Sequence, residues 1–266
     1  MRNRRLYPTS FALLAVLASF SGCAAPSGDF DEFTPILPGE EEVIDGAETT
    51  AEWLRGVVKI MNSDGTYCSG GLIDPRVVIT AAHCHGPKTV RVYTSRTAYK
   101  SYSVKSYKFH HNWEWHFAFW SGTNRHDDIQ AVYLNSAVPA SVAKPLAYEN
   151  DAPPKLGGAV IVGFGRYNAD NGDGGGIKRI GFVNVVHNKG SIEVEPGVLG
   201  QYGHKGDSGT VYLQWVEDES PGWKVVALHS GRDDGVNGKG PTLYDQKLWL
   251  FLAIVDLAKG GSSGSF

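Results

Sequence analysis

A serine flanked by glycines carries the strongest chemical signal in the sequence. Residues 206–209 read Gly-Asp-Ser-Gly. A serine hydroxyl becomes a good nucleophile only when a base takes its proton, and neighbouring glycines let a carbonyl group approach while backbone N–H groups face the developing oxyanion. The tetrapeptide alone is equally typical of a turn, so Ser208 is a candidate nucleophile that needs a base from elsewhere in the chain.

A histidine and an acidic pair could supply that base and its orienting acid. His83 follows a short apolar run and two alanines, and Asp127 and Asp128 precede another apolar run. Taken singly, a histidine after a strand is more often structural, and an acidic pair is usually a solvated turn. Together with Ser208 they occur in the order His, Asp, Ser, which distinguishes one architecture of serine peptidase from the orders of subtilisin and the α/β-hydrolases.

Many short strands are expected to position these residues. From Val43 onward, short apolar runs are separated by Gly, Pro, Asn and Asp, and this pattern predicts an all-β barrel or sandwich. Residues 244–257, with apolar side chains at helical spacing, predict a helix that closes the chain. The expected strands include residues 56–61, 77–80, 90–93, 159–162, 182–186, 211–216 and 225–228.

The composition is that of a globular protein. Of the 266 residues, 42% are hydrophobic and 20% are charged, and the formal net charge is −3. After residue 22 no apolar run approaches the roughly 18 residues needed to span a bilayer. The slightly acidic balance offers no basic face for nucleic acid. Membrane-spanning and nucleic-acid-binding functions are therefore disfavoured.

The first 42 residues predict export. A basic start precedes the apolar run 11–20, which is typical of an export signal over residues 1–22. The run ends in a segment that resembles a bacterial lipobox, so Cys23 is predicted to be acylated and to hold the protein on a membrane surface. The alternative is an ordinary secretory signal of a bacterial cell, which leaves the protein periplasmic or secreted. Residues 23–42 are rich in Pro, Gly and acids and predict a tether or propeptide.

The chain from Val43 to about Leu257 closely resembles the trypsin-like (chymotrypsin-fold) serine endopeptidases of bacterial type. This resemblance implies two antiparallel six-stranded β-barrels packed around an active-site cleft, with a C-terminal helix. The segments that carry it are Cys-Ser-Gly-Gly-Leu-Ile at 68–73, Thr-Ala-Ala-His-Cys at 80–84 and Gly-Asp-Ser-Gly at 206–209. Weaker landmarks are Val-Ile-Asp-Gly at 43–46, Phe-His-His-Asn-Trp at 109–113 and Gly-Phe-Gly at 163–165.

The resemblance implies a role for each candidate residue. Ser208 becomes the nucleophile, His83 the general base and then acid, and the N–H groups of Gly206 and Ser208 the oxyanion hole. The family's acid immediately precedes an isoleucine-containing strand, which favours Asp128 as the carboxylate that orients His83. Asp127 is the alternative, one residue away.

The resemblance also implies a disulfide and an activation step. Cys68 and Cys84 fall where the family has a disulfide that pins the histidine loop, and such a bridge contributes about 3 kcal/mol of stability. Cleavage between Glu42 and Val43 would release an α-amino group that pairs with Asp207 and orders the oxyanion loop. The chain therefore resembles a zymogen, and an activating protease is an expected partner.

The specificity pocket departs from that of trypsin. Six residues before the nucleophile, where trypsin has an aspartate, this chain has Tyr202, which disfavours basic P1 side chains. Residues 228–231 resemble a segment of bacterial glutamyl endopeptidases whose histidine helps bind an acidic P1 side chain, although the hydroxyl partner of that group falls on Gly203. An acidic or an apolar P1 side chain is expected. The predicted substrate-binding residues are Tyr202, Lys205, His229, Ser230, Gly231 and Arg232, with Ser230 also expected to support Asp128 from behind.

Two other clusters are read as loops, and neither a metal nor another cofactor is predicted. His110, His111, Glu114 and His116 lie among aromatic residues, but their spacing matches no zinc pattern. Residues 168–176 lack the ordered acid spacing of a calcium loop.

The sequence thus predicts an exported serine endopeptidase whose trypsin-like domain spans residues 43–266. It would hydrolyse proteins or peptides through a Ser-His-Asp triad and an acyl-enzyme intermediate. The competing hypothesis is a catalytically silent relative that binds a protein partner through the same cleft. A binding module has no need of all three triad residues, so the enzyme is favoured.

Overall fold

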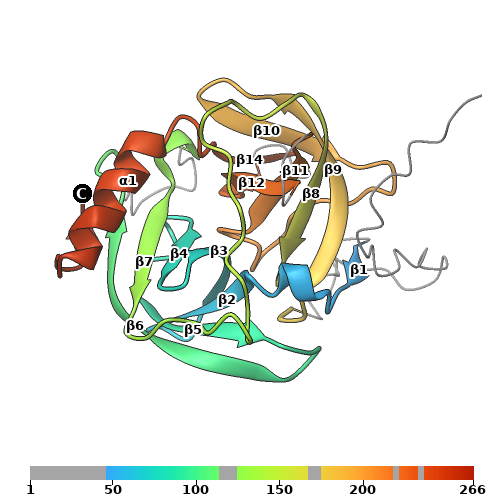
Figure 1. Cartoon of the computed structure of the whole chain (residues 1–266). Helices are drawn as coiled ribbons and strands as arrows, with labels where there is room; N and C mark the ends of the chain where they lie inside the picture. The colour runs from blue at the N-terminus through green and yellow to red at the C-terminus, as the bar shows by residue number, and fades with distance from the viewer. Residues whose placement is uncertain (1–45, 114–124, 167–174, 218–221, 233–236) are drawn as a thin grey trace, which may run out of the picture. The chain divides into compact units, whose positions relative to one another are not determined.

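The computed structural model describes residues 46–113, 125–166, 175–217, 222–232 and 237–266 (Figure 1). They form two β-sheets, in which almost all neighbouring strands are antiparallel, and one α-helix near the C-terminus. The predicted fold class, all-β with a closing helix, is confirmed.

The first sheet closes into a six-stranded barrel in the order β6-β5-β2-β3-β4-β7, because β6 also pairs with β7. Its strands are β2 (Val57–Asn62), β3 (Tyr67–Asp74), β4 (Val77–Thr80), β5 (Pro87–Tyr93), β6 (Tyr99–Phe109) and β7 (Gln130–Leu134). The short strand β15 (Gly264–Ser265) adds to β6 in parallel. A 3₁₀ turn, η2 (Arg125–Asp127), leads into β7.

The second sheet curls in the order β12-β11-β8-β9-β10-β14-β13, and β1 also pairs with β9. Its ladder does not close as the first one does. Within the described residues, one isolated bridge, Ala227 to Thr242, joins β12 to the residue that follows β14. The strands are β1 (Ala47–Glu48), β8 (Gly157–Gly163), β9 (Arg179–His187), β10 (Ser191–Pro196), β11 (Val211–Trp215), β12 (Trp223–Leu228), β13 (Gly231–Arg232) and β14 (Gly238–Pro241). The 3₁₀ turn η1 (Glu52–Leu54) follows β1.

Branched aliphatic side chains fill each sheet and the space between the sheets. Ile60 and Val132 lie in the core of the first barrel, and Val185 lies in that of the second sheet. A third cluster contains side chains of both sheets, Ile79 from β4 and Val211 from β11 among them. The burial of Val, Ile and Leu on pleated strands is the main force that holds such an architecture together.

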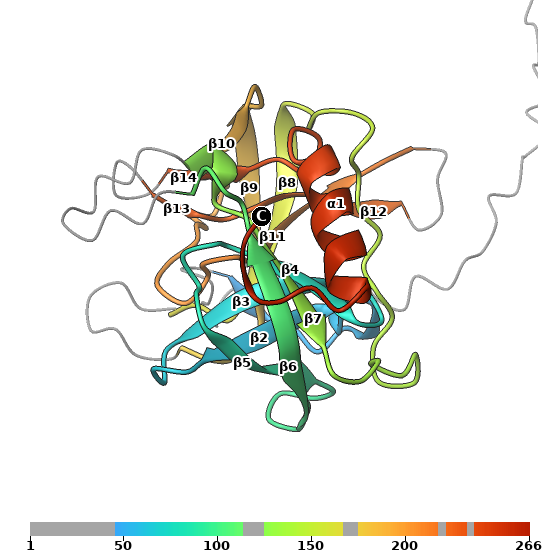
Figure 2. The same ribbon diagram turned by 90° about the vertical axis from the view of Figure 1, so that its left-hand side faces the viewer.

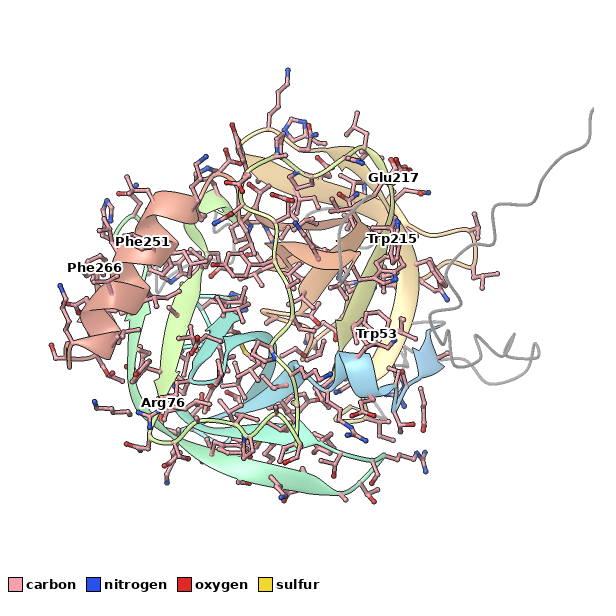
Figure 3. The ribbon with its side chains drawn as sticks, viewed as in Figure 1. Trp53, Arg76, Trp215, Glu217, Phe251 and Phe266 are labelled. Carbon is pink, nitrogen blue, oxygen red and sulfur yellow. A yellow bond between two sulfur atoms is a disulfide. The ribbon has the colours of Figure 1, made fainter. Side chains whose placement is uncertain are left out.

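The closing helix, α1 (Lys247–Ala258), begins three residues later than the sequence pattern predicts. It packs beside β6 and β7 (Figure 2). Its buried residues are Trp249, Leu250, Ala253 and Leu257, which repeat at helical spacing and join the central cluster. Phe251 is 63% exposed and points away from the sheets (Figure 3), so the apolar character of the helix exceeds what packing requires.

No helix within the described residues is both long enough and apolar enough to cross a membrane.

Candidate active site

The predicted base, His83, lies in the turn that follows β4 and is held there by a disulfide. Cys84 is bonded to Cys68 of β3, with a Cα–Cα distance of 6.2 Å and a sequence separation of 16 residues. Both cysteines are buried, at 6% exposure for Cys68 and 1% for Cys84. The predicted disulfide is confirmed, and it ties the histidine turn to the next strand of the barrel.

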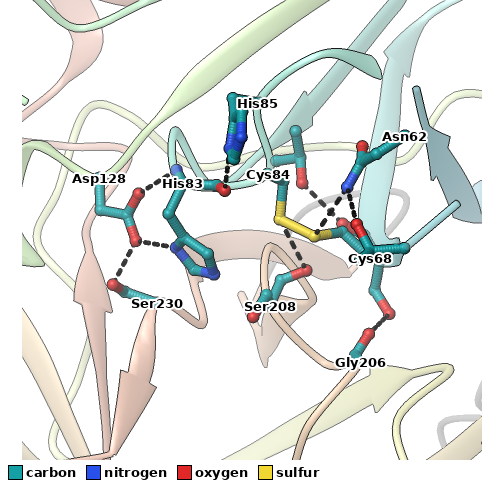
Figure 4. Close-up of a disulfide and its surroundings, with 12 residues drawn as sticks. Asn62, Cys68, His83, Cys84, His85, Asp128, Gly206, Ser208 and Ser230 are labelled. Carbon is teal, nitrogen blue, oxygen red and sulfur yellow. Dashed lines mark hydrogen bonds and ion pairs between the residues drawn. A yellow bond between two sulfur atoms is a disulfide. The ribbon is translucent and has the colours of Figure 1, made fainter. Parts of the chain in front are cut away.

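The carboxylate of Asp128 contacts both the side chain and the backbone N–H of His83. Its Oδ2 lies 2.7 Å from Nδ1 of His83, and its Oδ1 accepts the backbone N–H of His83 at 2.9 Å (Figure 4). The hydroxyl of Ser230 donates a further hydrogen bond to Oδ2. Asp128 has no exposed surface, so this carboxylate is fully desolvated and compensated by three donors.

The two partners shift each other's pKa in opposite directions. Burial raises the pKa of Asp128, but the charge of His83 and the hydrogen bonds from His83 and Ser230 outweigh burial and lower it. Burial lowers the pKa of His83, but the charge and hydrogen bond of Asp128 outweigh burial and raise it. A paired acid and base with these shifts suits a histidine that is protonated in the course of a reaction.

Asp127 contacts a different set of groups. Its Oδ1 lies 2.7 Å from Nδ1 of His126 and accepts a hydrogen bond from Nε2 of Gln246 at 3.1 Å. Nδ1 of His110 lies 3.6 Å from the same oxygen. Asp127 therefore anchors η2 to the start of α1, while Asp128 is the residue that contacts His83.

Ser208 lies in a turn between two glycines with left-handed backbones, φ +99° at Gly206 and +76° at Gly209. A Cβ atom at Gly209 would overlap Oγ1 of Thr80, so this position has room only for glycine. The backbone N–H of Ser69 donates to the carbonyl of Ser208 at 2.9 Å, and its hydroxyl donates to the carbonyl of Gly206 at 2.9 Å. One buried serine of β3 thus holds both ends of the turn.

The turn brings Ser208 to the histidine. The Sγ of Cys84 lies 3.7 Å from the carbonyl oxygen of Ser208, and Figure 4 shows Ser208 on the side of the imidazole away from Asp128. Within the described residues, the hydroxyl of Ser208 makes no hydrogen bond to His83, and the N–H groups of Gly206 and Ser208 have no acceptor. Such contacts commonly tighten only when a substrate binds.

Asp207 is a buried carboxylate at 1% exposure. It accepts the N–H of Gly165 at 2.7 Å and the N–H of His204 at 2.9 Å. Burial raises its pKa to about 6. No ion pair to Asp207 is found in the described part of the chain. Val43 lies outside that part, so the predicted activation pair stays a prediction.

Of the predicted pocket residues, Tyr202 and Arg232 lie close together. The guanidinium of Arg232 sits 5.2 Å from the ring centroid of the half-buried Tyr202, and its carbonyl accepts a hydrogen bond from Nη2 of Arg125 at 2.8 Å. A Cβ at Gly231 would overlap Nη1 of Arg125. Lys205 is exposed at the surface. Arg125, which contacts Arg232 and lies against Gly231, was not singled out by the sequence, although it stands only three residues before Asp128.

His229 is almost wholly buried, at 2% exposure, and its Nδ1 lies 2.6 Å from the hydroxyl of Tyr212. Tyr212 was not predicted as a functional residue. A tyrosine inside an apolar strand cannot be told from a core residue by pattern alone.

No group of three or more His, Cys, Asp or Glu side chains in the described ranges is arranged to hold a metal ion. His110 and His111 stack with ring centroids 4.6 Å apart. Glu114, His116 and residues 167–174 lie outside the described residues, as do Cys23 and Glu42.

Comparison with known proteins decides the family. Residues 43–246 match the family model described as Trypsin. The chain belongs to the trypsin family. This membership makes it a relative of serine proteases that act on protein substrates.

The similar proteins share only about a quarter of their aligned residues with this chain. Snake venom serine protease rhinocerase 4 of Bitis rhinoceros is 26% identical over 162 residues, which cover 55% of this chain and 58% of the relative. Trypsin alpha-4 of Lucilia cuprina is 25% identical over 162 residues, which cover 58% of each chain. The chain thus spans less than two thirds of the length of these curated relatives. Neither relative bears on the predicted bacterial type or on the resemblance to glutamyl endopeptidases.

The trypsin-like fold is also found among solved structures. Neuropsin, a serine protease expressed in the limbic system of mouse brain, superposes with a TM-score of 0.62 at 17% identity, over 79% of this chain and 98% of that chain. At this identity the likeness supports the fold.

Proposed function

We propose that this protein is a serine endopeptidase in which Ser208, His83 and Asp128 form the catalytic triad. The observation that carries the proposal is the pair of contacts from His83 to the buried carboxylate of Asp128, at 2.7 and 2.9 Å, beside the turn that holds Ser208. A histidine acts as a general base when a carboxylate holds its ring in the right orientation, and the buried Asp128 contacts both the ring and the backbone of His83.

The reaction follows from these groups. His83 takes the hydroxyl proton of Ser208 as the oxygen attacks the scissile carbonyl, and Asp128 stabilises the imidazolium that forms. The N–H groups of Gly206 and Ser208 receive the oxyanion. His83 then gives its proton to the leaving amine, which leaves an acyl-enzyme on Ser208. A water molecule, deprotonated by His83, hydrolyses the ester and restores the serine.

The proposed substrates are proteins or peptides with an acidic or apolar P1 side chain. Tyr202 stands where trypsin has its acidic pocket residue, and the guanidinium of Arg232 lies over the Tyr202 ring. A cation in this place disfavours Lys or Arg at P1. The glutamyl-endopeptidase resemblance of the segment around His229 supports the acidic alternative.

The proposed activation step is cleavage between Glu42 and Val43 by another protease. Within the described residues, Asp207 is a buried carboxylate whose hydrogen bonds come from two backbone N–H groups, and this supports the step, because a new ammonium group would offset the cost of desolvating Asp207. Residues 23–42 would then be the tether or propeptide of the trypsin-like domain, residues 43–266.

The proposed location is outside a bacterial cytoplasm, on a membrane surface through an acylated Cys23, after removal of residues 1–22. The features that support this are the basic start, the apolar run 11–20 and the small residues before Cys23. Mass spectrometry of the N-terminal peptide of the wild type and of Cys23→Ala tests it. A diacylglyceryl adduct on Cys23 supports the anchor, whereas an unmodified cysteine leaves a periplasmic or secreted enzyme.

Acyl-enzyme trapping tests the proposed activity. The protein cleaved before Val43 is quenched in acid during hydrolysis of a peptide ester and is then digested for mass spectrometry. We expect an acyl group on the peptide that contains Ser208, and none in Ser208→Ala. Hydrolysis at an equal rate in Ser208→Ala would contradict the proposal.

A further inference from the structure

Six large apolar side chains lie exposed on one side of the second sheet. They form the apolar face, which consists of Trp53, Leu156, Phe182, Val198, Leu199 and Trp215. Four of the six line one open hollow of about 410 Å³ together with Trp223, and the ring of Trp53 stacks on that of Trp223 with centroids 6.1 Å apart. Figure 3 shows Trp53 and Trp215 on the same side of the domain. A contiguous exposed apolar surface of this kind marks a site of interaction with a protein or a membrane.

The apolar face includes a tight turn with two apolar corners. The N–H of Gly200 donates to the carbonyl of Gly197 at 2.9 Å, which closes a four-residue turn after β10. Its corners are Val198 and Leu199, which are 93% and 66% exposed. The usual residues in such turns are Gly, Pro, Asn, Asp and Ser. Two branched aliphatic side chains held out from a turn therefore favour an apolar surrounding over water.

The remaining residues of this surface suit the headgroup level of a lipid bilayer. Trp53 and Trp215 are each 45% exposed, and tryptophan is enriched where a protein meets the membrane interface. Among the described residues that line the hollow, Lys155 is the only charged one, and it is exposed. A lysine stem can lie along an apolar surface while its ammonium reaches a lipid phosphate. The surface thus offers apolar groups to acyl chains and a cation to the headgroups.

The chain enters the described domain beside the apolar face. The strand β1 pairs with the start of β9, and Phe182 lies two residues beyond the paired Ile180. The proposed tether, residues 23–42, precedes β1 in the sequence, so an acyl group on Cys23 would bring this side of the domain to the membrane. Cleavage before Val43 would cut the tether, and the domain would then need a membrane contact of its own to stay there.

We propose that the apolar face is a membrane-docking surface, which holds the domain on a lipid bilayer after cleavage has separated it from Cys23. Val198 and Leu199 enter the boundary of the acyl chains, and Trp53 and Trp215 lie among the headgroups. This inference rests on the proposed export and the proposed cleavage before Val43, and it does not depend on the proposed peptidase activity.

Docking in this way leaves the proposed active site open. The strand β11 begins at Val211, three residues after Ser208, and ends at Trp215. A strand rises about 3.3 Å per residue, so Trp215 lies roughly 13 Å beyond Val211. The nucleophile and the apolar face are therefore at opposite ends of β11, and a substrate can reach Ser208 while the domain is docked.

Vesicle binding tests the inference without turnover. The protein is cleaved before Val43 and separated from the released segment, so that neither the apolar run 11–20 nor an acylated Cys23 contributes. It is then sedimented with vesicles of phosphatidylcholine, with or without phosphatidylglycerol. We expect it to bind both kinds of vesicle. Val198→Ser combined with Leu199→Ser should weaken binding by at least about 10-fold, because two side chains that enter the bilayer become polar.

The matched control removes two similarly exposed apolar side chains from another surface. Leu248 and Phe251 lie on α1 and are 68% and 63% exposed, and Figure 3 shows Phe251 on the side of the domain opposite Trp215. Leu248→Ser combined with Phe251→Ser should leave vesicle binding unchanged. Vesicles with brominated acyl chains give a second readout, because they should quench the tryptophan fluorescence of the wild type and of this control but not that of the Val198 and Leu199 double variant.

The inference is overturned if the cleaved wild type binds neither kind of vesicle, or if the two double variants lose binding equally. Binding that needs phosphatidylglycerol and is abolished by salt would also overturn it, because charge attraction alone would then explain the result. Sedimentation velocity without lipid tests for a second copy of the chain as the occupant. A dimer that dissociates in the Val198 and Leu199 double variant, without vesicle binding, would assign the face to that copy. The expected vesicle binding supports the inference even if Ser208 proves unreactive.

Discussion

The carboxylate of Asp128 binds His83 twice, with Oδ2 at 2.7 Å from the ring Nδ1 and Oδ1 at 2.9 Å from the backbone nitrogen. The first contact sets the tautomer and tilt of the ring, and the second fixes the backbone that carries it. Because Asp128 is fully buried, no solvent competes for either contact. The orientation of His83 therefore depends on one carboxylate.

Removing the charge of that carboxylate should remove most of the activity. Asp128→Asn replaces an acceptor of the Nδ1 proton with an amide that favours the wrong tautomer, and we expect kcat to fall by about 10⁴-fold. Peptide hydrolysis by the form cleaved before Val43 measures this. Asp127→Asn is the control, because Asp127 contacts His126 and Gln246 instead. Comparable losses in the two variants would contradict the assignment of Asp128.

The pH dependence of hydrolysis should report the raised pKa of His83. The general base must be neutral, so kcat/KM should fall as pH decreases through the pKa of His83 in the folded enzyme. The charge of Asp128 outweighs burial and places that pKa above the ordinary value of 6.5. We expect the acidic limb of the profile to have its midpoint above 6.5. A midpoint well below 6.5 would show that burial dominates over Asp128.

The buried acid beside the nucleophile should make the stability of the uncleaved chain depend on pH. Burial raises the pKa of Asp207 from 3.8 to about 6. A raised pKa contributes stability that is fully present below pH 3.8 and is lost as pH rises through about 6. The difference of about two pKa units corresponds to about 3 kcal/mol.

Urea unfolding of the uncleaved chain at pH 4 and pH 7 measures that contribution, with Asp207→Asn as the reference that cannot ionise. Relative to Asp207→Asn, the wild type should lose about 2 kcal/mol of unfolding free energy between pH 4 and pH 7, because part of the contribution is already lost at pH 4. An unchanged difference between the two proteins would show that Asp207 is already compensated before cleavage.

The disulfide should contribute mainly to stability. Replacing Cys68 and Cys84 together by serine opens a loop of 16 residues and should lower the free energy of unfolding by about 3 kcal/mol. Chemical denaturation at neutral pH gives the value, and hydrolysis by the folded fraction should be affected less. If the midpoint of unfolding did not move, the bridge would not be constraining the histidine turn.

Much of this site could be predicted from the sequence because its residues stand in short, distinctive segments. His83 follows two alanines and precedes a cysteine, and Ser208 is flanked by glycines that its turn requires. The choice of Asp128 over Asp127 also followed from local order. The strand predictions fell within or overlapped the observed strands because each apolar run is bounded by turn residues.

The parts that sequence reasoning missed depend on contacts between distant segments. Tyr212 contacts His229 only because the register of β11 places its hydroxyl there. The late start of α1 has a similar cause. The hydroxyl of Thr242 accepts the N–H of Asp245 at 3.1 Å and forms a turn before the helix. Residues 244–246, which the apolar pattern assigns to the helix, therefore precede α1.

Labelling of Ser208 by a fluorophosphonate, before and after cleavage at the Glu42–Val43 bond, tests the central claim most directly. The full chain is prepared with a site for a specific protease placed immediately before Val43, and labelled peptides are identified by mass spectrometry. We predict stoichiometric labelling of Ser208 after cleavage, little labelling before it, and none in His83→Ala. Failure of the cleaved chain to label would contradict the account and favour a catalytically silent member of the trypsin family.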